Sequence, residues 1–256
     1  MNNYNPFSLE NKTVLVTGAS SGIGRATAIE CSRMGATLVI TGRNAERLQE
    51  TFDLLEGTGH LRMVADLTDE AQVSSLVAEL PRLNGIVHNA GIGGDRTPCK
   101  MIRREKLDLV MGTNFTAPVL LQTALMQAKK IECEASIVFM ASRAPFAPVR
   151  GNALYTAAKA GLLGYAKVLG LEVAPQKIRV NCICPAMVLT ELAIRDFELV
   201  GADYRQDELL YPLKRYGKPE EIAYLAIYLL SDASVWMTGS RIDITGGGEF
   251  TLTGSK

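Results

Sequence analysis

The stretch Lys12-Thr-Val-Leu-Val-Thr17, followed by Gly18-Ala-Ser-Ser-Gly22-Ile-Gly24, decides which fold this chain can adopt. Its first half is a short apolar run typical of a buried strand, and the residues from Ile23 to Met34 have helical spacing. The glycines between them permit a tight turn, and the free N–H groups at the start of the helix can bind a phosphate. The spacing Gly-x-x-x-Gly-x-Gly is not the commonest dinucleotide fingerprint, but its place between strand and helix predicts nucleotide binding.

The same alternation of strand and helix continues along all 256 residues. It predicts one doubly wound α/β domain over residues 1–256, with a sheet flanked by helices. The segment 187–216 breaks the pattern, and its length is typical of a substrate lid. Further strands are expected at 36–42, 60–65, 85–88, 135–141, 177–184 and 240–244, and helices at 44–56, from Asp69 onward, at 106–130, at 155–173 and from Pro219 onward.

Composition excludes several classes of function. The 27 basic and 27 acidic residues cancel, and no basic block suited to nucleic acid is present. The first residues lack a signal pattern and no window approaches the 18 or more apolar residues of a membrane span, so we expect a cytoplasmic protein. Five cysteines without a Cys-x-x-Cys pair predict reduced thiols, and two histidines leave little material for a metal site or a Ser-His-Asp triad.

Arg43 bears on the choice of cofactor. The second expected strand ends in Gly42-Arg43, where a protein that binds NAD usually places an acid for the ribose hydroxyls. An arginine there can instead hold a 2′-phosphate through charge-assisted hydrogen bonds, which favours NADP(H) over NAD(H). The alternative is a solvated arginine at a strand end.

Tyr155 and Lys159 form the most informative pair outside the glycine-rich turn. Residues four apart on a helix are neighbours at about 5–6 Å. A positive charge at that distance favours the phenolate, so the pair predicts a tyrosine that exchanges protons at neutral pH. An ordinary helix with an exposed lysine is the other interpretation of these five residues.

Four polar residues elsewhere have more than one interpretation. Asp66 is either a cap or an acceptor for the adenine amino group, and Asn114 is either a structural bridge or part of a polar relay. Ser142 follows an expected strand at the edge where open α/β sheets bind their ligands. His88 is expected to be a packed strand residue.

Taken in order, Thr17-Gly18-x-x-x-Gly22-x-Gly24, Asn89-Ala90-Gly91, Asn114, Ser142 and Tyr155-x-x-x-Lys159 resemble the motifs of the short-chain dehydrogenase/reductase family over nearly the whole chain. The resemblance implies a Rossmann-type, seven-stranded parallel sheet in a single domain. Gly42-Arg43-Asn44 and the glycines near the end are similar to 3-oxoacyl-carrier-protein reductases.

The resemblance also implies a role for each matching residue. Tyr155 would exchange the proton with the substrate oxygen, and Lys159 would lower its pKa and hold the nicotinamide ribose. Ser142 would bind the substrate oxygen, and Asn114 would anchor a water in the proton relay. The implied cofactor contacts are Gly18, Ser20, Ser21, Gly22, Ile23, Gly24 and Arg43 to adenosine and phosphates, Asp66 and Leu67 to adenine, Asn89, Ala90 and Gly91 on the ribose side, and Pro185, Val188 and Thr190 near the nicotinamide.

The expected function is therefore an NADPH-dependent reductase of ketones, similar to 3-oxoacyl reductases, that uses no metal and forms a homotetramer or homodimer. Arg143 and Arg150 near an otherwise apolar pocket admit an acyl, a steroid-like or an acidic small ketone. Carrier-protein reductases dock their acidic carrier with arginines, and the stretches that align with these by resemblance are Glu132-Cys133-Glu134 and Pro175-Gln176-Lys177. We expect them to attract an acidic carrier poorly. The alternatives are an alcohol, sugar-acid or steroid dehydrogenase that works in the oxidative direction and a nucleotide sensor without activity.

Overall fold

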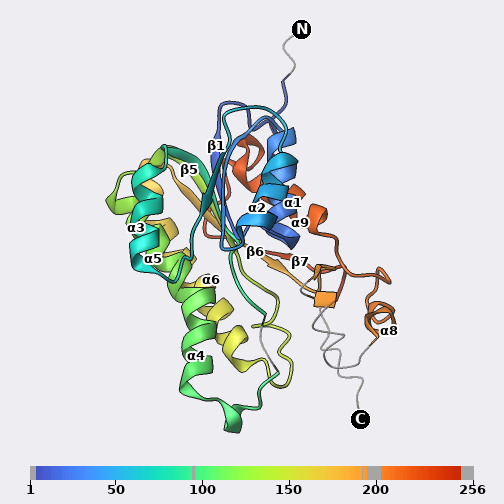
Figure 1. The fold of residues 1–256 in the computed structure, drawn as a ribbon. Helices are drawn as coiled ribbons and strands as arrows, with labels where there is room; N and C mark the ends of the chain where they lie inside the picture. Colours follow the sequence, from blue (N-terminus) through green and yellow to red (C-terminus); the bar gives the residue numbers. More distant parts are fainter. Residues whose placement is uncertain (1–3, 94–95, 192, 195–202, 249–256) are drawn as a thin grey trace.

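The computed structural model describes residues 4–93, 96–191, 193–194 and 203–248. Their seven strands form one parallel sheet in the order β3-β2-β1-β4-β5-β6-β7 (Figure 1). Because strand order reverses between β1 and β4, the loops that follow these two strands leave toward opposite faces. The predicted Rossmann-type sheet and all seven predicted strands are confirmed.

Each strand lies within a few residues of its predicted position. The first three helices are also where the spacing placed them. The strands are β1 (Thr13–Thr17), β2 (Thr37–Gly42), β3 (Leu61–Val64), β4 (Leu83–His88), β5 (Ile131–Met140), β6 (Arg179–Pro185) and β7 (Arg241–Ile244); the principal helices are α1 (Gly22–Arg33), α2 (Ala45–Asp53), α3 (Glu70–Glu79), α4 (Arg104–Met111), α5 (Ala117–Gln127), α6 (Ala153–Val173), α8 (Tyr204–Glu208) and α9 (Pro219–Leu230).

The helices cover both faces of the sheet. Figure 1 shows α1, α2 and α9 on one face and α3, α4, α5 and α6 on the other. Each layer has its own apolar core, and Phe139 of β5 is fully buried in the second. Two predicted caps are confirmed, since the side chain of Asn44 accepts from Arg47 N–H and that of Asp69 accepts from the N–H groups of Ala71 and Gln72.

The long helix predicted over 106–130 is interrupted. A π-helical turn at Gly112–Thr116 separates α4 from α5, and the last turn ends at Gln127. Pro118 explains the interruption, because it has no N–H to donate to the carbonyl of Asn114 four residues earlier. The break therefore lies at the one polar residue that this helix was predicted to contribute to the site.

The run Arg104–Gln127 is, by length and composition alone, capable of crossing a membrane. Length and composition alone are weak evidence for a membrane span, because a buried core helix passes the same test. Val110, Leu121 and Leu125 of this run are buried in the fold, which explains the apolar composition without a membrane.

His88 is confirmed as a packed residue of β4. Its ring stacks on Phe139 with centroids 4.6 Å apart, and Nε2 lies 2.9 Å from Gln122 Oε1. Burial lowers the pKa of His88 to about 4, and the hydrogen bond with Gln122 opposes this shift only partly.

His88 makes stability depend on pH. Because the folded protein keeps His88 neutral, its contribution is complete above pH 6.5, the ordinary pKa, and is lost as the pH falls toward about 4. Between pH 7.5 and 5, the free energy of unfolding should fall by about 2 kcal/mol more in the wild type than in His88→Asn. Urea denaturation at both pH values measures this difference, and equal decreases in the two proteins would contradict it.

Candidate active site

The turn between β1 and α1 packs directly on the chain that follows β4. Gly18 has φ +65°, and a Cβ there would lie 2.7 Å from Ala90 Cα. A Cβ on Gly24 would overlap the carbonyl oxygen of Gly18. Both positions therefore require glycine, one for its conformation and for space, the other for space alone.

Hydrogen bonds made by the side chains of Thr17 and Asn89 hold these two chain segments together. Thr17 Oγ1 accepts from the N–H groups of Asn89 and Ala90, both at 3.0 Å. Asn89 Nδ2 donates to the carbonyls of Thr17 and Gly18 at 3.1 and 3.2 Å. The amide of Asn89, which we predicted to contact the ribose side, thus holds the glycine-rich turn in place.

The start of α1 has the properties of a phosphate site. Ser21 occupies the N-cap position without a capping bond from its side chain, and the first turn has no acidic residue. Arg25 Nη2 donates to the carbonyl of Ser20 at 2.8 Å, which steadies the turn. A Cβ on Gly22 would lie 3.2 Å from Thr190 Cγ2, so Thr190 borders the same turn. Free helix N–H groups and a backbone cradle without side chains fit the pyrophosphate of a dinucleotide.

Charged residues surround the end of β2. Arg43 Nη1 lies 3.9 Å from Asp66 Oδ2, and Asp66 Oδ1 accepts from the N–H and hydroxyl of Thr68 at 2.9 and 2.7 Å. The bonds from Thr68 are the main reason that the pKa of Asp66 is lowered. Asp66 is therefore a turn residue before α3, whose cap is Asp69, and its Oδ2 is the atom that does not bind Thr68.

Arg47 also lies at this end of the site, and we did not identify it from the sequence. Its Nη1 lies 3.1 Å from Glu191 Oε2, which joins the first turn of α2 to the segment that follows β6. Most of the segment between Glu191 and Asp203 is outside the described residues, so the predicted lid is described only at its ends. No local pattern connects residues so distant in sequence, which is why Arg47 was missed.

Ser142, Tyr155 and Lys159 converge beyond the end of β5. Ser142 follows β5 and is nearly buried, and its hydroxyl makes a hydrogen bond with Tyr155. Lys159 is 5% exposed, its Nζ donates to the carbonyl of Met140 at 2.8 Å, and it lies 5.7 Å from the centre of the Tyr155 ring. The predicted spacing of the tyrosine and lysine on one helical face is confirmed.

The predicted lowering of the phenol pKa is not present in this structure. Burial raises the pKa of Tyr155, and the hydrogen bond with Ser142 opposes the rise. Burial also lowers the pKa of Lys159 to about 8. We had considered only the attraction between the two groups, whereas the loss of water around each is the larger effect here.

Asn114 is fully buried and bridges to the chain after β4. Its Oδ1 accepts from Ile92 N–H at 2.9 Å, and its Nδ2 donates to the carbonyl of Ile92 at 3.1 Å. A Cβ on Gly91 would lie 2.6 Å from Asn114 Oδ1 and 3.7 Å from Lys159 Nζ, so the three residues meet at one point. Of the two interpretations given for Asn114, its side chain has the structural one, because it bridges to Ile92. Its main-chain carbonyl lacks the usual helical donor, because Pro118 has no N–H.

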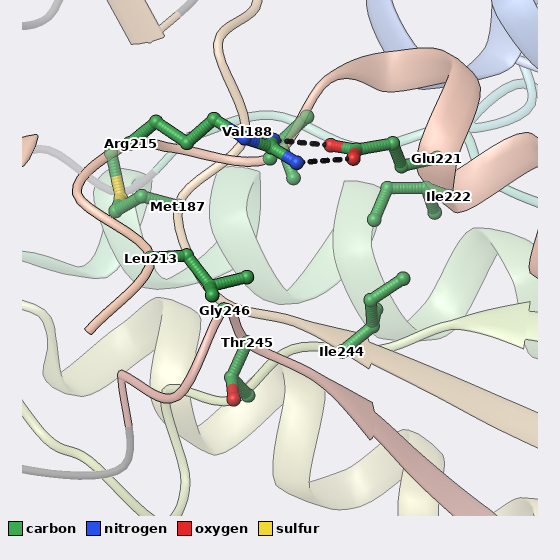
Figure 2. A pocket seen from close by; sticks show the side chains of 10 residues that line it. Met187, Val188, Leu213, Arg215, Glu221, Ile222, Ile244, Thr245 and Gly246 are labelled. Atoms are coloured by element: carbon green, nitrogen blue, oxygen red, sulfur yellow. Dashed lines mark hydrogen bonds and ion pairs between the residues drawn. The ribbon is translucent and has the colours of Figure 1, made fainter. Parts of the chain in front are cut away.

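Val188, which was predicted to contact the cofactor, lines a cavity beyond the end of β6. This cavity has a volume of about 110 Å³. Figure 2 shows the side chains that line it, among them Val188, Leu213 and Ile222. A bidentate ion pair between Arg215 and Glu221, at 2.6 and 2.7 Å, lies at its edge and is the main reason that the pKa of Glu221 is lowered to about 2. The backbone of Val188 pairs with Gly217, which joins the two ends of the predicted lid.

Arg143 is not a free cation, contrary to our expectation. Its Nη1 lies 3.0 Å from Asp243 Oδ2, and only 13% of its side chain is exposed. The two residues are far apart in sequence and meet because β7 lies beside β6. Arg150 is exposed, and none of the ion pairs found among the described residues includes it.

These features define a class of protein. A seven-stranded parallel sheet with a glycine-rich phosphate cradle at its switch point forms a nucleotide-binding domain of the Rossmann type. A serine, a tyrosine and a lysine placed beside that cradle add groups that can bind and protonate a substrate oxygen.

Known proteins identify the family. Residues 18–249 match the family described as Enoyl-(Acyl carrier protein) reductase. The chain is 31% identical to the 3-oxoacyl-(acyl-carrier-protein) reductase FabG of Rickettsia felis, over 93% of this chain and 97% of that protein. It is 32% identical to the D-threitol dehydrogenase of Mycolicibacterium smegmatis, over 94% of each. The crystal structure of levodione reductase superposes with a TM-score of 0.86 at 28% identity, covering 94% of this chain and 98% of that one.

The chain belongs to the short-chain dehydrogenase/reductase family. It is an oxidoreductase that acts on ketone or alcohol groups. The resemblance inferred from the motifs is confirmed.

Gly91 offers a direct test of the junction with Asn114. The methyl group in Gly91→Ala would displace Asn114 Oδ1 and disturb the position of Lys159, so we expect turnover to fall at least tenfold. Gly112→Ala is the matched control, because a Cβ there meets nothing within 4 Å and alanine favours a helix. Steady-state kinetics and thermal melting of both variants measure the effect, and similar activities would contradict the role of this contact.

Proposed function

We propose that this protein is an NADPH-dependent reductase of ketones, similar to 3-oxoacyl reductases. The observation that carries the proposal is the convergence of Ser142, Tyr155 and Lys159 beyond β5, next to the glycine-rich turn. A ketone oxygen between the Ser142 and Tyr155 hydroxyls would accept a hydrogen bond from each. The relatives named as 3-oxoacyl reductases support the substrate class.

The cofactor residues follow from the cradle that fits a pyrophosphate. The N–H groups at the start of α1, with Ser20, Ser21 and Ile23, would bind the phosphates. Arg43 would hold the 2′-phosphate, while Asp66 Oδ2 and Leu67 would border the adenine. Asn89 to Gly91, Pro185 and Thr190 would border the ribose and nicotinamide. When bound, the nicotinamide supplies the hydride chemistry of the reaction.

Tyr155 would supply the proton that the reduced oxygen takes up. In this structure its phenol is neutral, which is the form needed to donate a proton in the reductive direction. Lys159 would stabilise the phenolate left behind, since a cation favours the charged form. The main-chain carbonyl of Asn114, whose usual helical donor Pro118 cannot supply, would hold a water for the return of a proton to Lys159.

The direction of the reaction and the assembly are part of the same proposal. A ketone and its alcohol share one transition state, so the D-threitol dehydrogenase among the relatives supports an oxidative alternative for the same residues. Exposed Val168 and Leu171 on α6 and exposed Leu109 and Leu120 on the run from α4 to α5 support a homotetramer or homodimer. We also propose a cytoplasmic location. Glu134 pairs with Lys177 at 2.7 Å, which leaves this point without a free cation for an acidic carrier.

Tyr155→Phe tests the proton transfer. Removing one hydroxyl should lower turnover of an acetoacetyl thioester by about 10²- to 10⁴-fold while the dissociation constant of NADPH changes little. Tyr165→Phe is the matched control on the same helix, and it should keep nearly wild-type turnover. Steady-state rates and fluorescence titration with NADPH give the two quantities.

A Tyr155→Phe enzyme that retains its rate would refute the proposed role of the tyrosine. A panel of ketones and alcohols for the wild-type protein, including diketones, steroids and sugar acids, separates the reductive from the oxidative alternative. Cofactor binding without turnover of any compound would favour a sensor.

Arg43→Ala tests the choice of cofactor. A charge-assisted bond to the 2′-phosphate contributes about 1.5–3 kcal/mol, so the dissociation constant of NADPH should rise roughly 10- to 100-fold while that of NADH changes little. Arg62→Ala is the control, because Arg62 is an exposed arginine on the neighbouring strand β3. Titration of each variant with both cofactors measures the ratio, and equal losses for the two would contradict the proposal.

A further inference from the structure

The ion pair of Arg143 and Asp243 lies next to the proposed catalytic serine. Arg143 follows Ser142 directly, and its backbone N–H donates to the carbonyl of Pro185 at 2.9 Å. Its Nη1 lies 3.0 Å from Asp243 Oδ2, and the two side chains are only 13% and 20% exposed. The pair therefore lies at the ends of β5, β6 and β7, beside the place where the substrate carbonyl is proposed to bind.

A second arginine completes this cluster. Arg241 Nη2 lies 3.2 Å from the same oxygen of Asp243. The guanidinium of Arg241 stacks over Phe146, with its central carbon 3.8 Å from the ring centre, and that of Arg143 lies 5.5 Å from the same centre. The ring of Phe146 thus packs beside both guanidinium groups, and the carboxylate of Asp243 contacts each of them directly.

The cluster uses only part of the binding capacity of Arg143. Arg143 Nε and Asp243 Oδ1 are both buried, and neither has a hydrogen-bond partner in the part of the chain that the structure describes. An arginine and a carboxylate can form two parallel bonds, but here they form one. Because Nε is buried, only the terminal nitrogens of Arg143 could reach a carboxylate on a substrate, and Asp243 already binds one of them. The charge of Asp243 therefore opposes the approach of such a group.

Without Asp243, the site would contain a poorly solvated arginine beside Ser142. Such a cation binds anions strongly because few water molecules compete for it. The loop that follows Arg143 is Ala-Pro-Phe-Ala-Pro-Val, which contributes no other charge. Asp243 is therefore the residue whose charge offsets that of the buried Arg143, whereas Arg241 is 39% exposed and water screens its charge.

We propose that Asp243 determines specificity: by neutralising Arg143, it makes the site select uncharged ketones, such as esters and thioesters of 3-oxo acids, over ketones that carry a carboxylate near the carbonyl. The inference rests on the proposed function only in that Ser142 and Tyr155 hold the ketone oxygen. It removes the acidic ketones from the substrate classes that the sequence had left open.

Acetoacetate and methyl acetoacetate form a matched pair of probes, since they share the ketone and differ in one charge. In Asp243→Asn, the ratio of kcat/KM for acetoacetate to that for methyl acetoacetate should rise at least tenfold above the wild-type ratio. The double variant Arg143→Gln/Asp243→Asn should abolish this gain. Arg241→Gln is the control, because it leaves the ion pair of Arg143 and Asp243 in place. Asp243→Ser is a second uncharged variant if the asparagine variant does not fold.

Equal losses for the two probes in Asp243→Asn would overturn the inference, because a residue with only a structural role affects both alike. Calorimetric binding of both probes in the presence of NADP⁺ gives the comparison without turnover. Acetoacetate bound at least tenfold more tightly by Asp243→Asn than by wild type supports the inference, and an unchanged dissociation constant overturns it. A wild-type enzyme that reduces neither probe would count against the proposed function alone.

Discussion

The close contact between Gly18 and Ala90 is the constraint on which the rest of the site depends. At this contact the chains leaving β1 and β4 turn toward opposite faces of the sheet, and a side chain on Gly18 would force them apart. Thr17 and Asn89 fix the contact through hydrogen bonds to backbone groups on both sides. One side of the junction leads into the phosphate cradle at the start of α1. The other leads to Gly91, which touches Asn114 and lies near Lys159. The contact between Gly18 and Ala90 therefore positions both the phosphate cradle and the proposed catalytic groups.

Burial raises the pKa of Tyr155 and lowers the pKa of Lys159. Around Tyr155 and Lys159 it disfavours both charges, so the free protein holds a neutral phenol and an ammonium whose pKa is lowered to about 8. The ammonium keeps one strong bond, to the carbonyl of Met140. Such a lysine responds to a new negative charge more strongly than a solvated one would, because little water screens the interaction. The arrangement favours proton donation first and stabilisation of the resulting phenolate second, which is the order that ketone reduction needs.

Features set by neighbours in the sequence could be predicted, whereas features set by distant residues could not. The strand–turn–helix at Gly18, the caps Asn44 and Asp69, and the face shared by Tyr155 and Lys159 depend on residues at most a few turns apart, and all were predicted correctly. The break in the helix at Pro118 also had a local cause, but the apolar periodicity on both sides concealed it. The pKa of Tyr155 depends on burial by other elements, and the pairs of Arg47 with Glu191 and Arg143 with Asp243 depend on which strands and loops become neighbours. Their side chains gave no local signal.

The cations of the site are distributed unequally between its two ends. At the end of β2, Arg43 is 59% exposed and only 3.9 Å from a carboxylate that Thr68 already binds, so much of its charge remains for a phosphate. At the end of β5, Arg143 is nearly buried and directly paired with Asp243. An anion is thus attracted at one end of the site and not at the other, although both ends contain an arginine beside an aspartate. The difference lies in distance and solvation, because an ion pair that excludes water presents little net charge to a ligand. Under the proposed function, a ligand with a phosphorylated end and an uncharged reacting end would match this distribution in one orientation, with its phosphate toward Arg43 and its reacting end toward Ser142 and Tyr155.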